Sequence, residues 1–396
     1  MSSCLTQSSC LKHLARRGTR AGLAAALVSA TALSGCAVPS AHRAAPIPGL
    51  APAAAARQAA ATLKEAPCGK PPVKLEPKAQ DFLNQLAAAG GPPLYTLSYA
   101  AARASLDKLQ AGPVAKPAAD ITERTIPGGP TGSVSLRIVR PAGVTGTLPG
   151  IVYIHGGGWI LGNAMTHDRL VRQLAVGARA AIVFVNYTPS PEAQYPVPLE
   201  QIYTASQWVA RNGRSIGIDP GRLAVAGDSV GGNMAAALTM LAKERGGPHF
   251  RRQALLYPVT DARFDTGSYR RFAEGCWLTL PAMKWFWNAY APNAADRDKP
   301  TVSPLRATLA QLRGLPPALV ITDSDVLSDE GMAYADKLRQ AGVAVTGSHY
   351  PAITHDFMML NALAGTQADK DAVAETTRML REALYAPADP SPGKGK

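Results

Sequence analysis

The 396-residue chain is poor in aromatic residues, at 6% of its length, and has 28 acidic residues against 41 lysines and arginines. Four of these basic residues and no acidic one fall within residues 1–36, so the net charge of +13 leaves +9 for the rest. The remaining lysines and arginines are scattered, without basic runs or interleaved aromatics, which argues against nucleic-acid binding. We therefore expect no nucleic-acid partner.

The apolar stretch near the N-terminus is too short to span a bilayer. It covers residues 21–33, follows the basic stretch 12–20 and runs into Leu33-Ser-Gly-Cys36, which resembles a bacterial lipobox. This resemblance implies a signal peptide over residues 1–36, cleavage before Cys36, and lipid on its thiol. We expect an exported cell-envelope lipoprotein, anchored in the outer membrane if the cell has two membranes. Ordinary signal cleavage followed by secretion is the alternative.

The chain has few cysteines. Of the five, Cys4 and Cys10 leave with the signal peptide and Cys36 would carry the lipid, so Cys68 and Cys276 are the two that remain available for pairing. In an oxidising compartment, a single remaining pair favours a disulfide. Two separate buried thiols are the alternative.

The rest of the chain divides by composition. Residues 37–75 are rich in alanine and proline, which is typical of a tether. Residues 76–390 form the predicted domain, and residues 391–396 a short tail. Apolar spacing predicts two helices at the start of the domain, over residues 78–89 and 99–110.

From residue 121 onwards, apolar strand patterns alternate with helical ones. This alternation predicts an α/β fold with a mostly parallel central sheet and helices on both faces. We expect a hairpin over 121–127 and 133–139, then strands at 150–154, 181–186, 223–226, 253–257, 318–322 and 343–350. Helical spacing lies between most of them and in a closing segment around 373–384. One insertion, between Tyr257 and Ala318, holds three of the five tryptophans. It forms either a lid over a site or the core of a small subdomain, or both.

The strongest local motif is Gly227-Asp-Ser-Val-Gly231. A short apolar strand over 223–226 precedes it, and a run of helix formers over 234–245 follows. Strand, glycine-flanked turn and helix together indicate a nucleophile elbow that exposes Ser229. A serine hydroxyl needs a base to take its proton and a third group to orient that base.

We expect the base and acid to follow later strands. His355 lies just beyond the strand 343–350 and is the best base, because His349 lies inside that strand and His249 in a surface loop. For the acid, Asp323, Asp325 and Asp329 all follow the strand 318–322. We interpret Asp329 as a helix N-cap and Asp323 as a residue that hydrogen-bonds its own loop backbone. Asp325 is then the best placed to reach an imidazole.

A glycine run supplies candidate oxyanion donors. His155-Gly-Gly-Gly-Trp159 follows the strand 150–154, and we expect the amides of Gly156, Gly157 and Val230 to hold the oxyanion. A phosphate-binding loop would need a following Lys-Ser or Lys-Thr, which is missing. His155 has no second ligand spaced near it, so we predict no metal site and interpret it as bracing the loop.

Together these motifs resemble those of the bacterial hormone-sensitive-lipase family of α/β-hydrolases. The family's G-D-S-A-G-G is here Gly227-Asp-Ser-Val-Gly-Gly232, its D-P-L-R-D-E-G is Asp325-Val-Leu-Ser-Asp-Glu-Gly331, and its H-G-F is His355-Asp356-Phe357. The motif D-Y-R-L-A-P-E is less well matched, by Asn186-Tyr-Thr-Pro-Ser-Pro-Glu192. The aligned acid motif strengthens the assignment of Asp325.

The resemblance implies a carboxylic-ester hydrolase that acts on short- to medium-chain acyl esters and needs no cofactor. It also implies a helical cap, here residues 76–115 and 260–305. Trp159, Tyr187 and Trp277 are candidate pocket walls. The same triad could serve an amidase or peptidase, and the same fold could serve as a ligand-binding protein without catalysis. An amidase would favour a pocket acid for a free amine, and a non-catalytic protein would be expected to lose a member of the triad.

Overall fold

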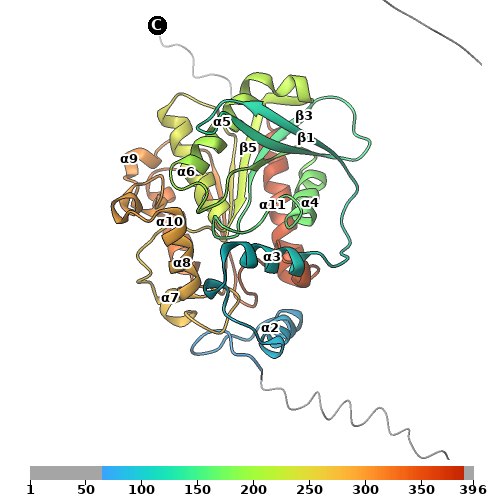
Figure 1. Ribbon diagram of the computed structural model, residues 1–396. Helices are drawn as coiled ribbons and strands as arrows, with labels where there is room; N and C mark the ends of the chain where they lie inside the picture. Colours follow the sequence, from blue (N-terminus) through green and yellow to red (C-terminus); the bar gives the residue numbers. More distant parts are fainter. Residues whose placement is uncertain (1–64, 388–396) are drawn as a thin grey trace, which may run out of the picture. The chain divides into compact units, whose positions relative to one another are not determined.

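The computed structural model describes residues 65–387, and a single eight-stranded sheet organises them (Figure 1). The strand order is β1-β2-β4-β3-β5-β6-β7-β8. The strands are β1 (Ala119–Pro127), β2 (Ser133–Pro141), β3 (Leu148–Ile154), β4 (Ala181–Asn186), β5 (Ile218–Asp228), β6 (Gln253–Leu256), β7 (Ala318–Asp323) and β8 (Val345–Tyr350).

The sheet is parallel except at one edge. β1 pairs with β2 and β2 with β4 in antiparallel fashion, whereas the strands from β4 through β3 to β8 are parallel. Every residue of β3 and β7 is buried, because parallel strands covered on both faces carry apolar side chains throughout. The predicted α/β-hydrolase fold is confirmed, and each predicted strand forms.

Helices cover both faces of the sheet (Figure 1). α4 and α11 pack against each other on one face, and α5 and α6 pack together on the other, with α10 against β7. The helices are α2 (Pro77–Ala89), α3 (Tyr99–Gln110), α4 (Asp168–Ala178), α5 (Val197–Asn212), α6 (Val230–Glu244), α7 (Gly267–Arg271), α8 (Leu280–Tyr290), α9 (Leu309–Leu312), α10 (Ser328–Gln340) and α11 (Gln367–Tyr385). Short 3₁₀ turns are η2 (Leu94–Thr96), η3 (Gly213–Ile216), η4 (Ala294–Asp298), η5 (Pro304–Arg306) and η6 (Asn361–Leu363).

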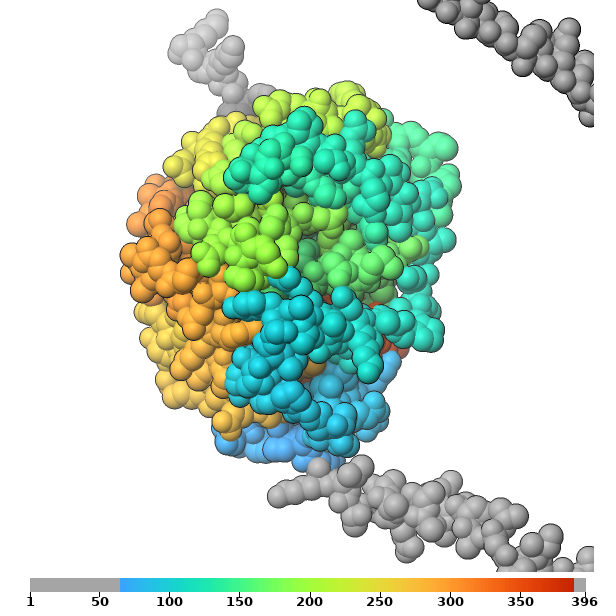
Figure 2. Space-filling view, viewed as in Figure 1, coloured from blue at the N-terminus to red at the C-terminus, as the bar shows by residue number. Residues whose placement is uncertain are grey.

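Two segments far apart in sequence form a cap beyond one end of the sheet. In Figure 1, α2 and α3 gather there with α7 and α8 of the insertion, and Figure 2 shows the blue-to-cyan early residues packed against the orange insertion. Tyr99 of α3 stacks on Trp285 of α8 with ring centroids 5.2 Å apart. Trp285 thus helps to pack the two cap segments together, whereas Trp277 and Phe286 of the same insertion line the cavity beside Ser229.

The end of the predicted tether is part of the folded domain. Residues 65–75 pack against it: Cys68 and Leu75 are buried, and Lys70 N donates to Arg271 O at 2.8 Å. Cys68 is bonded to Cys276 in a disulfide, so the prediction of a free tether up to residue 75 is wrong over this stretch. Cys36, the lipobox and the tail 391–396 lie outside the described residues.

Between residues 65 and 387, we find no helix with both the length and the apolar character required to cross a membrane.

Candidate active site

Ser229 stands at the sharp turn between β5 and α6. Its φ of 54° and ψ of −119° are strained for a non-glycine residue, as a nucleophile elbow requires. Glycines make this turn possible: a Cβ on Gly227 would overlap the Gly231 carbonyl, and one on Gly231 would overlap the Ile154 carbonyl. Ser229 N donates to Leu256 O at 2.8 Å, which fixes the turn against β6.

The structure brings the three predicted catalytic side chains into one hydrogen-bonded chain. Ser229 Oγ donates to His355 Nε2 at 3.0 Å, and His355 Nδ1 donates to Asp325 Oδ2 at 2.5 Å. All three residues are buried. Asp325 is held in turn, because its Oδ1 accepts from Leu327 N at 2.9 Å. This is the order of donors and acceptors that activates a serine nucleophile.

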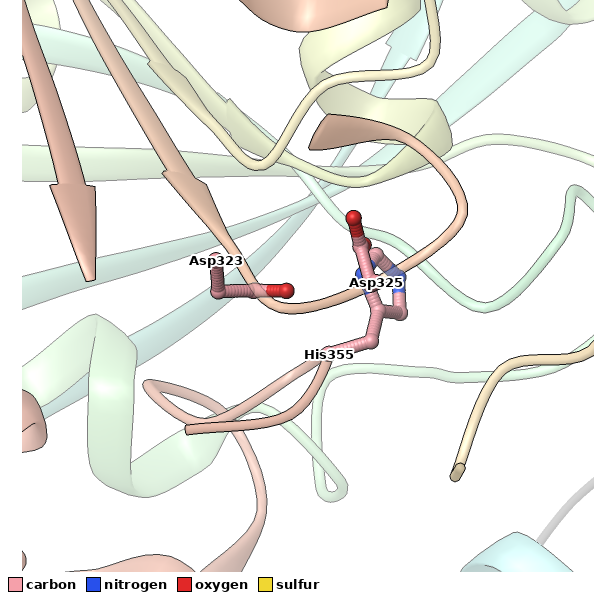
Figure 3. A group of neighbouring side chains, drawn as sticks. All are labelled: Asp323, Asp325 and His355. Carbon is pink, nitrogen blue, oxygen red and sulfur yellow. The ribbon is translucent and has the colours of Figure 1, made fainter. Parts of the chain in front are cut away.

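A second carboxyl, Asp323, lies beside this chain at the end of β7 (Figure 3). Asp323, Asp325 and His355 place one ligand atom each within 4.8 Å of one another. However, both ring nitrogens of His355 already make hydrogen bonds, and the cluster forms part of the serine site, so it does not suggest a metal centre.

Asp323 and Asp329, the two other candidates for the acid, do not have the roles that the sequence suggests for them. Asp323 is fully buried, and neither carboxyl oxygen has a hydrogen-bond partner among the described residues, so it does not bond its loop backbone as predicted. Burial, and then the charge of Asp325, raises its pKa well above its ordinary value. Asp329 is also not the N-cap of α10, because Leu327 occupies that position and Asp329 Oδ2 instead accepts from Ser268 N at 2.7 Å.

The oxyanion loop differs from the prediction in one donor. The Gly156 amide is occupied, because it donates to Asp228 Oδ1 at 3.1 Å. Gly157 and Gly158 instead line the cavity beside Ser229 and Val230, and no hydrogen bond within residues 65–387 engages their amides. The candidate donors are therefore Gly157, Gly158 and Val230, and the assignment of Gly156 is wrong.

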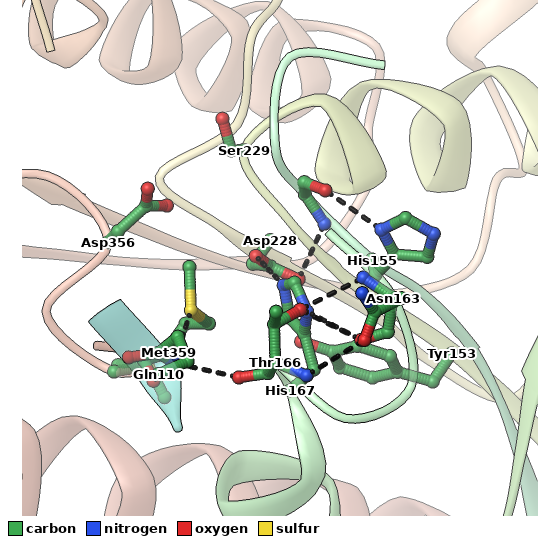
Figure 4. A network of polar contacts seen from close by, with 12 residues as sticks. Gln110, Tyr153, His155, Asn163, Thr166, His167, Asp228, Ser229, Asp356 and Met359 are labelled. Atoms are coloured by element: carbon green, nitrogen blue, oxygen red, sulfur yellow. Dashed lines mark hydrogen bonds and ion pairs between the residues drawn. The ribbon is translucent and has the colours of Figure 1, made fainter. Parts of the chain in front are cut away.

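Asp228 ties the oxyanion loop to the nucleophile turn (Figure 4). Besides Gly156 N, its Oδ1 accepts from Tyr153 OH at 2.6 Å, and its Oδ2 pairs with His167 Nε2 at 3.1 Å. Burial raises the pKa of Asp228, but His167 opposes burial and the net shift is downwards. The same pairing raises the pKa of His167 in spite of its burial. Sequence reasoning noted the motif but missed this role.

His155 braces the loop, as the sequence suggests. Its ring stacks on Tyr187, with centroids 4.3 Å apart, and on Phe184, with centroids 5.2 Å apart. Burial, and then the neighbouring His167, lowers the pKa of His155 to about 3, so the ring is neutral. A neutral ring in an aromatic stack fits a packing role.

A cavity of about 560 Å³ opens beside Ser229 and His355. Its walls are mostly apolar side chains of the cap, including Leu86, Leu106, Leu109, Trp277, Met283 and Phe286. Trp277 is thus placed where the sequence predicts it, beside the disulfide at Cys276. A second, larger hollow lined by residues such as Arg211, Arg251 and Phe250 contains none of the predicted site residues.

Two predicted pocket walls lie elsewhere. Trp159 is fully buried against Trp287 and Tyr290, with the Tyr290 ring stacked 4.3 Å away. Its side chain therefore lies in the core, and Trp159 is not among the residues that line the cavity. Tyr187 is buried against His155 and donates to His155 O at 3.0 Å. Phe286 takes the wall position instead and packs so closely on Gly158 that any Cβ there would overlap it.

Comparison with known proteins agrees with this geometry. Residues 151–359 match a family described as alpha/beta hydrolase fold. Carboxylesterase NlhH of Mycobacterium tuberculosis is 38% identical over 288 residues, which cover 72% of this chain and 89% of that protein. Ethyl acetate hydrolase of Pseudomonas putida is 37% identical, over an alignment that covers 64% of this chain and 78% of that protein. The crystal structure of a thermostable esterase from Pseudomonas putida ECU1011 superposes with a TM-score of 0.78 at 49% identity, over 79% of this chain and 99% of that one.

Proposed function

The chain belongs to the hormone-sensitive-lipase-like family of the alpha/beta hydrolase fold, and we propose that it hydrolyses carboxylic esters through an acyl-enzyme on Ser229. The observation that carries this proposal is the hydrogen-bonded chain Ser229–His355–Asp325, whose serine and histidine line a mostly apolar cavity. A protein that only binds ligands has no need of such a chain. Among the described residues, the one acid that borders the cavity is Asp356. Its Oδ2 accepts from Trp277 Nε1 at 3.0 Å and its Oδ1 lies 3.3 Å from His355 Nε2, so its oxygens face the protein and the amidase alternative has no specific support.

The proposed mechanism follows from the positions of the donors. Ser229 Oγ attacks the ester carbonyl while His355 Nε2 takes its proton, and Asp325 holds the imidazolium that forms. The amides of Gly157, Gly158 and Val230 stabilise the oxyanion. When the tetrahedral intermediate collapses, Nε2 returns the proton to the departing alcohol. Water then repeats the sequence on the acyl-serine and releases the acid.

The cap favours short- to medium-chain acyl groups. Its side chains close an apolar cavity of about 560 Å³ around the nucleophile, which lies within the size range of small-molecule sites. We expect para-nitrophenyl esters with acyl chains of about two to eight carbons to be good substrates, with kcat/KM falling for longer chains.

The test is hydrolysis of this ester series by residues 60–396, with Ser229→Ala as the matched variant. We expect the turnover of Ser229→Ala to be lower than that of the wild type by roughly 10⁴-fold or more. Equal rates in both proteins would overturn it. A normal melting temperature for Ser229→Ala shows that the loss is chemical, because this substitution removes only a hydroxyl.

We also propose that the protein is exported and carries lipid on Cys36. The support is the basic stretch, apolar stretch and lipobox-like residues 33–36. In a host that processes lipoproteins, full-length protein should enter the detergent phase of a Triton X-114 partition. Cys36→Ser should remain in the aqueous phase. The same partition for both proteins would contradict lipid attachment.

A further inference from the structure

Asp356 directly follows His355 and turns its carboxyl back towards the imidazole. Asp356 Oδ1 lies 3.3 Å from His355 Nε2, while Oδ2 accepts from Trp277 Nε1 at 3.0 Å. The residue has a φ of 64°, in the left-handed region that favours glycine and, among other residues, asparagine and aspartate. An aspartate here therefore fits the backbone but introduces a charge beside the predicted base.

Asp356 Oδ1 is buried and has no hydrogen-bond partner among the described residues. A buried acceptor without a partner destabilises the fold, because it has lost its hydrogen bonds to water. In the resting enzyme, His355 Nε2 accepts from Ser229 and cannot also donate to Asp356. Once Nε2 takes the serine proton, it becomes a donor within reach of Oδ1.

We propose that Asp356 is a positioning residue for the base, whose carboxylate accepts the new Nε2–H of His355 and so stabilises the imidazolium while Ser229 attacks. The proposal rests on the proposed function of Ser229 and His355. A contact that improves only after proton transfer accelerates the reaction, because it stabilises the transition state more than the ground state. His355 is then held from both sides, by Asp325 at Nδ1 and by Asp356 at Nε2.

The charges around this pair support the assignment. Facing groups on other elements are Asp323 and Asp325 at the end of β7, Asp228 at the end of β5, Tyr257 after β6, and His167 before α4. Burial alone would lower the pKa of His355, but the charge of Asp356 and then the hydrogen bond to Asp325 outweigh it and raise that pKa. Burial raises the pKa of Asp356, and His355 opposes that shift without cancelling it, so the net change in this pKa is upward.

The structure supports a contact between Asp356 Oδ1 and the imidazole better than a contact between Oδ1 and the substrate. Asp356 borders the cavity, but Oδ1 itself is closed to solvent and faces the imidazole. Trp277 fixes the other oxygen. The carboxylate is therefore anchored by the cap and directed at the base.

The test is Asp356→Asn, which keeps the size, tolerates the left-handed backbone, and leaves an amide oxygen to accept from Trp277. We expect the acid limb of kcat/KM for para-nitrophenyl butyrate to move down by about one pH unit, which is a tenfold change in proton affinity. We expect kcat on the plateau to fall about tenfold, with KM within twofold of wild type. Asp356→Gly should give the same shift and also change KM, because Trp277 loses its acceptor.

A wild-type acid limb and plateau in Asp356→Asn would overturn the proposal. If Asp356 only holds Trp277, Asp356→Gly changes KM and melting temperature, while Asp356→Asn stays like wild type. Failure of the proposed function is distinguishable, because it appears as wild-type rates in Ser229→Ala. In that event, NMR titration of ¹³C-labelled histidine, assigned with His355→Gln, still tests the pair: an unchanged His355 pKa in Asp356→Asn overturns the proposal.

Discussion

The amide of Gly156 donates to the carboxylate of Asp228 at 3.1 Å, and this bond joins the oxyanion loop to the nucleophile turn. The Gly156 amide is therefore already hydrogen-bonded within the protein, whereas the amides of Gly157 and Gly158 remain available to the substrate. Because Asp228 is adjacent to Ser229, one carboxylate sets the distance between nucleophile and oxyanion donors.

Asp228→Asn should therefore damage both stability and turnover. An amide in place of the carboxylate removes the charge that pairs with His167 in a fully buried site, at a cost of about 3 kcal/mol in unfolding free energy. We expect kcat to fall as well, because the remaining amide oxygen is a weaker acceptor for Gly156 N than the carboxylate and holds the loop less firmly. Urea unfolding and ester kinetics measure the two effects. Tyr153→Phe is the control, since it removes only one hydrogen bond to Asp228 Oδ1. Wild-type stability and kinetics in Asp228→Asn would contradict the anchoring role.

The contact between Gly158 and Phe286 gives a second prediction. Gly158→Ala should lower kcat/KM by about 10²-fold, because the new Cβ overlaps the Phe286 ring and displaces an oxyanion donor. Phe286→Ala in the same chain should restore part of the loss. Recovery should be incomplete, since alanine at a φ of 63° still costs about 1–2 kcal/mol. Wild-type kinetics in Gly158→Ala would show that the Gly158 amide is not an oxyanion donor.

Loss of the disulfide should act on both stability and substrate binding. Cys68→Ser with Cys276→Ser frees two segments that are 208 residues apart in sequence, and we expect a loss of about 2–4 kcal/mol in unfolding free energy. Trp277 follows Cys276 and lines the cavity, so KM should rise more than kcat falls. Thermal melts and butyrate kinetics, with wild type in reductant as the matched comparison, test both effects. An unchanged melting temperature would show that the bridge does not support the fold.

The raised pKa of Asp323 predicts how the free energy of unfolding changes with pH. Its pKa is raised well above the ordinary value in the folded state, so the folded chain retains a proton that the unfolded chain releases near pH 4. Stability from this group is full below that pH and is lost as pH rises towards the folded pKa.

Asp323→Asn removes this loss, because an amide has no proton to release. Between pH 4 and pH 8, the melting temperature of the variant relative to wild type should increase until the pH reaches the folded-state pKa of Asp323. Asp336→Asn is the matched control, because it makes the same substitution at an exposed aspartate and leaves Asp323 in place. A constant difference for Asp323→Asn across this range would refute the raised pKa.

Much of the fold follows from the sequence because its signals are local. Buried parallel strands such as β3 and β7 are continuous apolar runs, and glycines mark the turn at Ser229. The residues of the predicted triad could be chosen because each follows a strand whose carboxyl end reaches the same edge of the sheet.

The remaining features depend on contacts that local patterns do not encode. The occupied amide of Gly156 depends on a carboxylate 72 residues away. The sequence suggests Trp159 as a cavity wall, but its ring packs against Trp287 and Tyr290, which lie more than 120 residues further along the chain. The folded segment 65–75 is held by Cys276, far along the chain.

If Ser229 is the nucleophile and His355 activates it, diethyl para-nitrophenyl phosphate should phosphorylate Ser229. Mass spectrometry of the treated protein locates the label. We predict one diethylphosphoryl group on the peptide that contains Ser229, formed rapidly in wild type and slowed by about 10³-fold or more in His355→Gln. A label on another residue, or none while ester hydrolysis continues, would contradict it.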